Sequence, residues 1–179
     1  MDKNDFFPSS DYKVPSTSNY MKLTEGEHNF RVLSSAIVGF EYFNRDNKPV
    51  RYREYPEEIP NDIKSDGRLN HFWAFAVWNY EAKRIQILEI TQKSIQMPMQ
   101  ALINNPKWGN PKGYDITITR KGTGMQDTEY AVMPNPHSEL DLAIIETYKR
   151  VQPNLEGLFD GLDPFAKETT SDGSGMPTF

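Results

Sequence analysis

HFWAFAVWNYEAKRIQILEITQ, residues 71–92, is the stretch that decides the fold. It contains two strand-like runs, 71–80 and 83–91, joined by a tight turn, and its aromatic rings are interleaved with cationic and amide side chains. Such a surface suits unpaired bases, because every base presents a π-face that stacks on a ring. The same residues also suit a β-core, since Trp, Tyr and Phe favour strands without any ligand. The rest of the chain has to distinguish these two interpretations.

The length and composition predict one domain with tails. A chain of 179 residues suits a single core of about 100 to 150 residues. The absence of cysteine excludes a disulfide framework and thiolate metal sites, and no secretory signal or transmembrane segment is found. We therefore expect a cytoplasmic protein, with a flexible N-terminal arm at 1–19 that is rich in Pro, Ser and Asn.

The net charge of −5 lies entirely in the C-terminal part. Residues 1–136 carry 17 acidic and 17 basic side chains, whereas residues 137–179 carry 8 acidic and 3 basic ones. A neutral body can hold a local cationic groove, and an acidic segment that competes for this groove would weaken non-specific binding. A tail that only keeps the protein soluble explains the same charges.

The hydrophobic pattern predicts five strands with a helix between the third and the fourth. The first strand is long, with a phase slip at Ser34 and Ser35 and a glycine, Gly39, that suits a bend. Between the first two strands, the polar and proline-rich segment 44–70 predicts a functional loop. Pro134 and Pro136 are expected to end the last strand. The predicted strands are 27–43, 71–80, 83–91, 114–120 and 128–133, and the predicted helix is 94–104.

This order of elements predicts a mainly β fold, namely an OB-fold at 20–137. The OB-fold is a five-stranded, partly open barrel that binds oligonucleotides across strands two and three and through its first and fourth loops. An amphipathic helix, 138–151, is expected to begin the C-terminal acidic segment 138–168 and to pack on the outside of the barrel. Residues 169–179 have the Gly, Ser and Asp content of a disordered tail.

Four segments resemble phage-type single-stranded DNA-binding proteins with one OB-fold. They are YMKLTEGEHNFRVL at 20–33, FWAFAVWNYEAKRIQILEITQKSI at 72–95, WGNPKGYDITITRKGTG at 108–124 and TEYAVMP at 128–134. The resemblance implies a protein that coats and protects single-stranded DNA during phage replication or recombination, in the host cytoplasm, without catalysis and without a cofactor. It carries no residue-level binding motif over to this chain.

The last nine residues, SDGSGMPTF at 171–179, are similar to the acidic, Pro-Phe-ending peptide with which bacterial single-strand binding proteins recruit partners. The similarity implies that Asp172, Pro177 and Phe179 contact replication or recombination proteins, although Thr178 separates the last Pro from the last Phe. The more acidic LEGLFDGLDPF at 155–165 is a rival partner motif. Alternatively, its apolar residues dock back onto the barrel.

Side chains of strand 71–80 alternate between two faces. Trp73, Phe75 and Val77 share one face, and the other carries Phe72, Ala74, Ala76, Trp78 and Tyr80. The sequence leaves open which face points inward. The two small alanines favour the second face as the binding face, because they leave room for bases between the flanking rings. We therefore expect Trp78 and Tyr80 to be the stacking platforms, with Trp73 as the alternative and Arg84 on the next strand as a phosphate contact.

The first loop region alternates cations with rings and is the best candidate for a clamp on the DNA backbone. Three acids, Glu54, Glu57 and Glu58, follow at once, so a solvated loop remains an alternative. Basic residues near the fourth loop and after the helix extend the path. The expected clamp residues are Tyr42, Arg45, Arg51, Tyr52, Arg53 and Tyr55, and the expected extensions are Arg120, Lys121, Lys107 and Lys112.

No catalytic motif accompanies these residues. The three histidines lie far apart in the sequence without the spacing of a zinc site, and KGTG at 121–124 lacks the opening and the end of a phosphate-binding loop. We therefore expect a non-enzymatic binding protein. A structural or protein-interaction module of a phage particle is the alternative from another class. RNA binding also stays open, since no feature here reads the 2′-hydroxyl.

Overall fold

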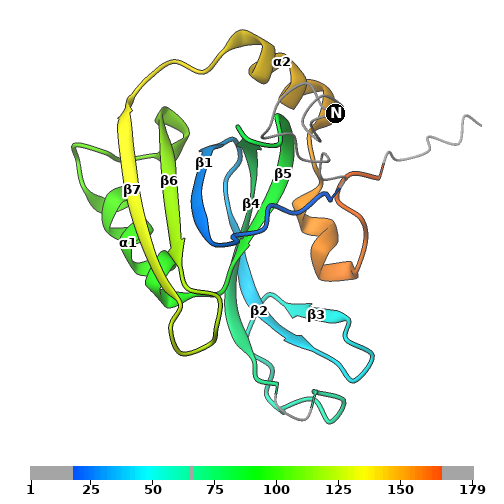
Figure 1. The fold of residues 1–179 in the computed structure, drawn as a ribbon. Helices are drawn as coiled ribbons and strands as arrows, with labels where there is room; N and C mark the ends of the chain where they lie inside the picture. The colour runs from blue at the N-terminus through cyan, green and yellow to red at the C-terminus, as the bar shows by residue number, and fades with distance from the viewer. Residues whose placement is uncertain (1–17, 65–66, 167–179) are drawn as a thin grey trace, which may run out of the picture.

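A seven-stranded antiparallel sheet is the framework of the computed structural model, which describes residues 18–64 and 67–166 (Figure 1). The strand order is β3-β2-β4-β1-β6-β7, and β5 pairs with β4 outside this path. No ladder in the described part joins β5 to β7, so the sheet is open. The mainly β class is thus confirmed. The strands are β1 (Gly26–Val32), β2 (Ile37–Phe43), β3 (Pro49–Tyr52), β4 (Asn70–Asn79), β5 (Arg84–Ile90), β6 (Tyr114–Lys121) and β7 (Glu129–His137).

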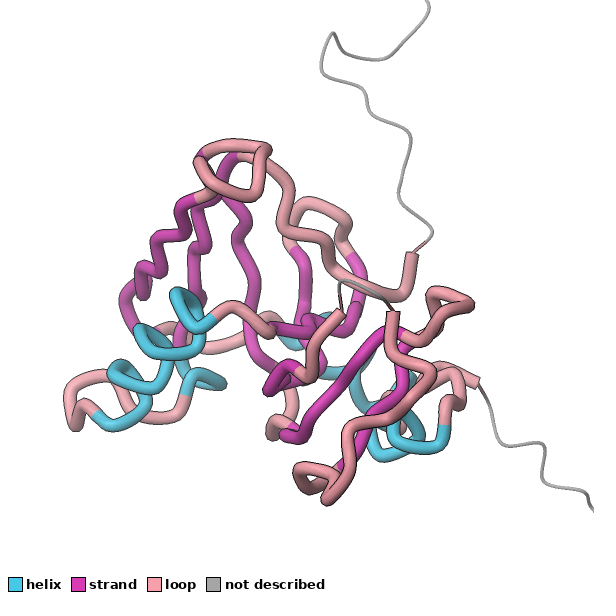
Figure 2. Tube along the Cα trace, turned by 90° about the horizontal axis from the view of Figure 1, so that it is seen from below, coloured by secondary structure: helices cyan, strands magenta, loops and turns pink. Residues whose placement is uncertain are grey.

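Within the described residues, two α-helices and two short 3-10 helices complete the fold. Helix α1 (Lys93–Asn104) lies between β5 and β6, as the sequence predicts, and α2 (Leu142–Val151) follows β7. The 3-10 helices are η1 (Pro111–Gly113) and η2 (Leu155–Asp160). Figure 2 shows helices on two opposite sides, with strands between them. No helix in the described part of the chain is long and apolar enough to cross a membrane.

The predicted long first strand is two strands that share one partner. Val32 at the end of β1 lies opposite Val77, and Ile37 at the start of β2 lies opposite Ala74, so both strands pair with β4. The break falls at 33–36, where the phase slip was expected. Gly39 serves another purpose, because a Cβ there would lie 2.3 Å from the backbone carbonyl of Tyr52. Its lack of a side chain allows β3 to approach.

Three other boundaries differ from the prediction. The expected loop 44–70 contains β3, which pairs with β2. Strand β7 continues through Pro134 and Pro136, because it lies at the edge of the sheet, where proline is tolerated. Helix α2 starts later than expected and is capped by Asp141, whose side chain accepts a hydrogen bond from the N–H of Ala143. Ser138 instead accepts hydrogen bonds from the buried Arg31.

The expected N-terminal arm reaches the sheet at its end. The N–H of Ile87 in β5 donates to the carbonyl of Asn19 at 2.8 Å, and the N–H of Met21 donates to the carbonyl of Ile87 at 2.9 Å. Residues 18–21 therefore run along β5, whereas 1–17 lie outside the described residues, as does the expected disordered tail 169–179.

Hydrophobic clusters fill both sides of the sheet. On one side, α1 packs through Ile95 and Met99 against side chains of β1, β4, β5 and β6. On the other side, α2 and residues 155–165 pack against β4 and β5. Figure 1 shows α1 apart from α2 and from the orange 3-10 helix η2, which follows α2. We call the side of the sheet that packs against α1 the inner face, and the other side the outer face.

Candidate nucleic-acid interface

The outer face of β4 is covered by the chain's own C-terminal elements. Phe72 and Ala74 are fully buried beneath Leu155 and Leu158 of η2, and Ala76 is fully buried in a cluster with α2. The expectation that the small alanines leave room for bases is therefore wrong for this structure. The space above them holds residues 140–165, which we call the C-terminal cover.

Trp78 and Tyr80, the expected stacking platforms, belong to this covered face. Both are half-buried and pack in the cluster that contains Leu140 and Tyr148 of the cover. The Tyr80 hydroxyl donates to Asp115 at 2.8 Å. Burial, together with this hydrogen bond, raises the pKa of Tyr80 to about 12. Both rings therefore hold the cover against the sheet.

The segment LEGLFDGLDPF at 155–165 docks onto the sheet, as the second of its two interpretations predicted. The ring centroids of Phe159 and Phe72 lie 5.9 Å apart, and Phe165 packs against both outer clusters. The other expected partner residues, Asp172, Pro177 and Phe179, lie outside the described residues.

Arg51 is a buried ion-pair residue and does not project from a loop as a phosphate contact. Its side chain is 7% exposed and donates to Glu89 at 2.7 Å, while its Nε lies 3.4 Å from Glu41. Burial disfavours its charge, but Glu89 raises the Arg51 pKa overall. Burial raises the pKa of Glu41 to about 9, together with a hydrogen bond that its protonated carboxyl donates to the neighbouring Glu89. Arg51 is therefore unsuited to the expected backbone clamp, because it is buried and Glu89 already neutralises its charge.

Other expected clamp residues also have partners within the fold. Tyr42 is buried and donates to Asp62 at 2.8 Å, and its ring stacks against Tyr52 with centroids 6.2 Å apart. The exposed Arg53 pairs with Glu156 of the cover. Its guanidinium also lies 4.2 Å from the ring centroid of Phe159. Arg45 is exposed and donates to the carbonyl of Asn61.

The cations expected near strands three and four lie in three separate places. Arg84 donates to Asn19 at 3.3 Å. Arg120 donates to the backbone carbonyl of Leu23 at 2.8 Å, so it links β6 to the entry of β1. Lys121 is exposed at the end of β6. The structure therefore does not assemble the expected cations and rings into one groove.

A different set of rings lies together on the inner face. Register places Val38 opposite Trp73 and Phe40 opposite His71, so these four residues share one face. The centroid of the Phe40 ring lies 5.2 Å from that of His71 and 5.3 Å from that of Tyr55, which meets it edge-on. We call Phe40, Tyr55, His71 and Trp73 the aromatic strip.

The strip is partly open to solvent, since Phe40 and Trp73 are half-buried. Tyr55 is 58% exposed, and Val38, which lies between strip residues, is 52% exposed. His71 is exposed too, and its ring is held by a hydrogen bond between Nδ1 and the carbonyl of Gly39 at 2.9 Å. Exposed rings fixed by neighbours lose little freedom when a flat ligand stacks on them.

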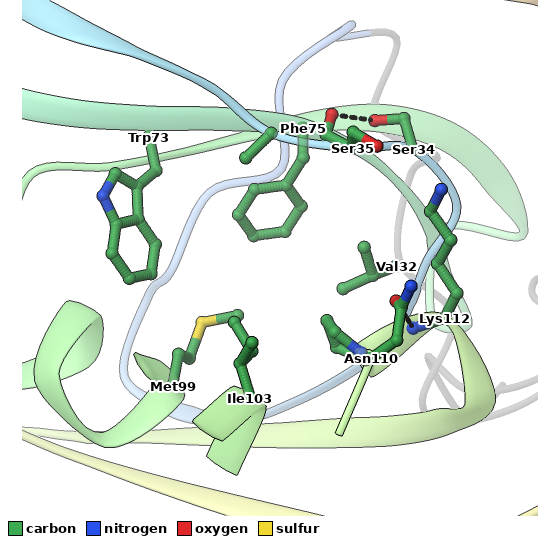
Figure 3. A pocket seen from close by; sticks show the side chains of 11 residues that line it. Val32, Ser34, Ser35, Trp73, Phe75, Met99, Ile103, Asn110 and Lys112 are labelled. Atoms are coloured by element: carbon green, nitrogen blue, oxygen red, sulfur yellow. Dashed lines mark hydrogen bonds between the residues drawn. The ribbon is translucent and has the colours of Figure 1, made fainter. Parts of the chain in front are cut away.

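A pocket of about 330 Å3 continues the strip at Trp73. Figure 3 shows Trp73 at one end and Val32, Asn110 and Lys112 at the other, with side chains of α1 along one wall. The volume lies at the lower end of the range of small-molecule sites, about 300 to 1,000 Å3. Its wall residues are Phe75, Met99 and Ile103, and Ser34, Ser35, Ala36 and Pro111 complete it.

Positive groups lie beside the strip at the start of α1. The Gln96 side chain of α1 donates to the carbonyl of His71 at 3.1 Å, so the first turns of α1 lie beside the strip. This helix has no acidic residue in its first turn, and Lys93 is exposed there. A helix N-terminus carries a partial positive charge. Lys112 adds a positive charge at the far end of the pocket, whereas the exposed Glu54, Glu57 and Glu58 adjoin Tyr55 in the sequence.

Phe40 and His71 are the functional candidates that sequence reasoning missed. Phe40 follows Val38 in a regular alternation, which reads as core, and His71 stands at the start of a strand. His71 already shares a face of β4 with Trp73, and only the pairing of β2 with β4 brings Phe40 beside them. No group of three or more His, Asp or Glu residues in the described part of the chain is placed to hold a metal ion.

Comparisons of the chain with protein-family models, with curated proteins and with solved structures gave no match.

Proposed function

We propose that this protein binds single-stranded DNA without sequence preference and without catalysis, through the aromatic strip. The observation that carries the proposal is the strip itself. Its four rings lie on one face, Tyr55 and His71 are exposed, Phe40 and Trp73 are half-buried, and the strip lies next to the start of α1 and a pocket that contains Lys112. Stacking of a base on an aromatic ring contributes about 1 to 3 kcal/mol and tolerates any base. Aromatic and apolar side chains that lie together on an open face mark an interaction site more often than scattered ones do.

The order of elements supports an OB-type architecture for this function. If β1 and β2 count as one broken strand and the short β3 is set aside, the chain runs strand, strand, strand, helix, strand, strand. That is the layout of the OB-fold, which binds oligonucleotides. The resemblance to phage single-stranded DNA-binding proteins assigns such a domain to phage replication or recombination.

In this proposal the strand lies along the inner face of the β2–β3 hairpin. Bases stack on Tyr55, on Phe40 with His71, and on Trp73, while Lys93 and Lys112 lie near the phosphates. Because two lysines are few for a nucleic-acid site, we expect the affinity for DNA to depend only weakly on salt concentration. Each neutralised phosphate contributes about 0.7 to the slope of log affinity against log salt for a single strand.

The test is fluorescence anisotropy of a labelled oligo-dT of about 20 nucleotides, titrated at about 50 mM and about 200 mM salt. Tyr55→Ala is expected to weaken binding about 5- to 100-fold, the loss of one stacked base. Phe43→Ala is the matched control, because Phe43 is 42% exposed on the opposite side of β2. Equal losses in both variants would remove the strip from the binding site.

The same titration separates the rival functions. If no oligonucleotide binds at low salt, the exposed strip belongs to a protein interface, as expected for a structural module of a phage particle. Oligo-rU of the same length tests the RNA alternative, because only a contact with the 2′-hydroxyl distinguishes the two sugars. Tighter binding of rU than of the matching deoxy strand would replace DNA by RNA in the proposal.

A further inference from the structure

The pocket at the end of the strip is lined by both apolar and polar side chains, which limits the kind of ligand that fits it. Its walls are apolar and aromatic, from Trp73, Phe75 and Met99, whereas Asn110 and Lys112 supply polar groups at the opposite end. A pocket with apolar walls and a few converging polar groups fits a flat, partly polar molecule.

The donors at this end are uncommitted. The Oδ1 of Asn110 accepts from the backbone N–H of Lys112 at 3.0 Å, which holds the amide in place at the start of η1. Its Nδ2 and the Nζ of Lys112 make no hydrogen bond or ion pair with any described residue. The amide is therefore fixed with its donor group available, and the lysine charge is available beside it. Among the described residues, no acidic side chain lines this pocket.

We propose that this pocket takes one nucleobase of the bound strand, turned out of the stack that runs along the aromatic strip. The inference rests on the proposed function and deepens it, since it assigns a separate base-binding position. The base ring lies between Trp73 and Met99, Nδ2 of Asn110 donates to an acceptor on the base edge, and Lys112 meets the adjoining phosphate. Every base has at least one edge acceptor, so binding stays independent of sequence.

The geometry favours a base of the same strand over a separate ligand. Val38 and Trp73 are register partners, and Trp73 belongs to both the strip and the pocket. A strand stacked on Phe40 and His71 therefore reaches the pocket mouth without leaving the surface. The break between β1 and β2 opens this mouth, because residues 34–36 leave the ladder there and Ser35 and Ala36 are exposed.

Methionine methyl groups give a probe inside the pocket and one beside it. Met99 is 2% exposed and lines the pocket, whereas Met97 on the same helix is 68% exposed and does not line it. The experiment uses the full chain labelled with 13C at the methionine methyls, and NMR titration with an oligo-dT of about 12 nucleotides. An inserted base shifts the Met99 resonance by its ring current and leaves Met97 in place. A strand of the same length without bases is expected to shift neither.

Asn110→Asp is the sharpest variant. It keeps the oxygen that accepts from Lys112 N–H, removes the amide donor, and adds a negative charge near the phosphate. We expect oligo-dT affinity to fall about tenfold, the loss of one good hydrogen bond, and the Met99 shift to disappear. Lys112→Met is expected to act in the same direction. Lys149→Met on α2 is the matched control, because α2 packs against the outer face, and it should bind as the unmodified protein does.

Three outcomes overturn the inference, and they differ in whether the proposed function also fails. If oligo-dT binds tightly but Met99 does not shift, or Asn110→Asp binds normally, the pocket holds no base and the proposed function survives. If no strand binds at all, the proposed function falls as well. If the hexapeptide SGMPTF, the sequence of residues 174–179, shifts Met99 and oligo-dT does not displace it, the pocket is a peptide site.

Discussion

The two faces of β4 carry similar side chains, but only the outer face is covered by a later segment of the chain. The outer face presents Phe72 and Trp78, and the inner face presents Trp73 and Phe75. The outer rings are packed beneath the C-terminal cover. On the inner face, Phe75 belongs to the core, whereas Trp73 lies at the edge of the core and is part of the aromatic strip. Aromatic content alone therefore does not mark a binding face. What decides is whether a later segment of the chain packs on it.

The largest effect is expected where the cover docks. Leu158 is 2% exposed against Phe72 and Ala74. Leu158→Ala should lower the free energy of unfolding by about 2 to 5 kcal/mol, because it removes buried apolar surface and leaves a cavity. Urea denaturation measures the change. Leu162→Ala is the matched control, since Leu162 is 59% exposed in the same segment, and it should cost less than about 0.5 kcal/mol. Similar values for both would mean that the outer face is not covered in solution.

The second effect compares one tryptophan from each face. Trp73→Leu should weaken oligo-dT binding by about 1 to 3 kcal/mol, since it removes a stacking ring. Trp78→Leu should leave binding unchanged and lower stability, because Trp78 packs in the cluster with α2. Anisotropy titration and urea denaturation of both variants separate the two losses. The opposite pattern would place the binding face beneath the cover.

The third effect is a pH dependence of the covered face. The pKa of Glu41 is raised to about 9 by burial and by Glu89, so the folded state holds this proton more tightly than the unfolded state, where the pKa is about 4.5. Its contribution is complete below pH 4.5 and is lost as the pH rises toward 9. Between pH 7 and 9 we expect a loss of about 2 kcal/mol.

Glu41→Gln isolates that contribution. The amide imitates the protonated acid in size and in its ability to donate a hydrogen bond, so the stability of this variant should change less between pH 7 and 9. Urea denaturation of both proteins at several pH values makes the comparison. A parallel decline in the two proteins would assign the pH dependence to other groups.

The sequence predicted the elements that depend on local pattern. Helix 94–104 agrees with α1 to within one residue, the hairpin 71–91 agrees with β4 and β5, and the alternation of β4 correctly separated Trp73 from Trp78. These features follow from hydrophobic periodicity and turn signals, which act over a few residues. They needed no knowledge of what packs on each face.

The rest depends on contacts between distant parts of the chain. Arg51 is neutralised by Glu89, which is far along the sequence, so its charge looked available. Ala74 looked like space for a base until Leu158 was found above it. Pro134 looked like a strand end, although edge strands tolerate proline. In each case the missing fact is tertiary, and no periodicity encodes it.

The smallest effect tests what holds the cover in place. Arg53 and Glu156 form an ion pair between the β3 end and η2, but their side chains are 60% and 58% exposed. Exposed pairs contribute about 0.2 to 1 kcal/mol, because water and salt screen them. Glu156→Gln should therefore lower stability by less than 1 kcal/mol, far below the loss from Leu158→Ala.

A double-mutant cycle with Arg53→Met and Glu156→Gln measures the coupling of the pair, with urea denaturation as the readout. The guanidinium also lies over Phe159, so Arg53→Met alone should cost slightly more than Glu156→Gln alone. High salt should reduce the coupling and leave the loss from Leu158→Ala unchanged. A coupling of several kcal/mol would instead mean that the ion pair holds the cover on the sheet. In that case the salt concentration, rather than apolar burial, would decide whether the outer face of β4 is covered.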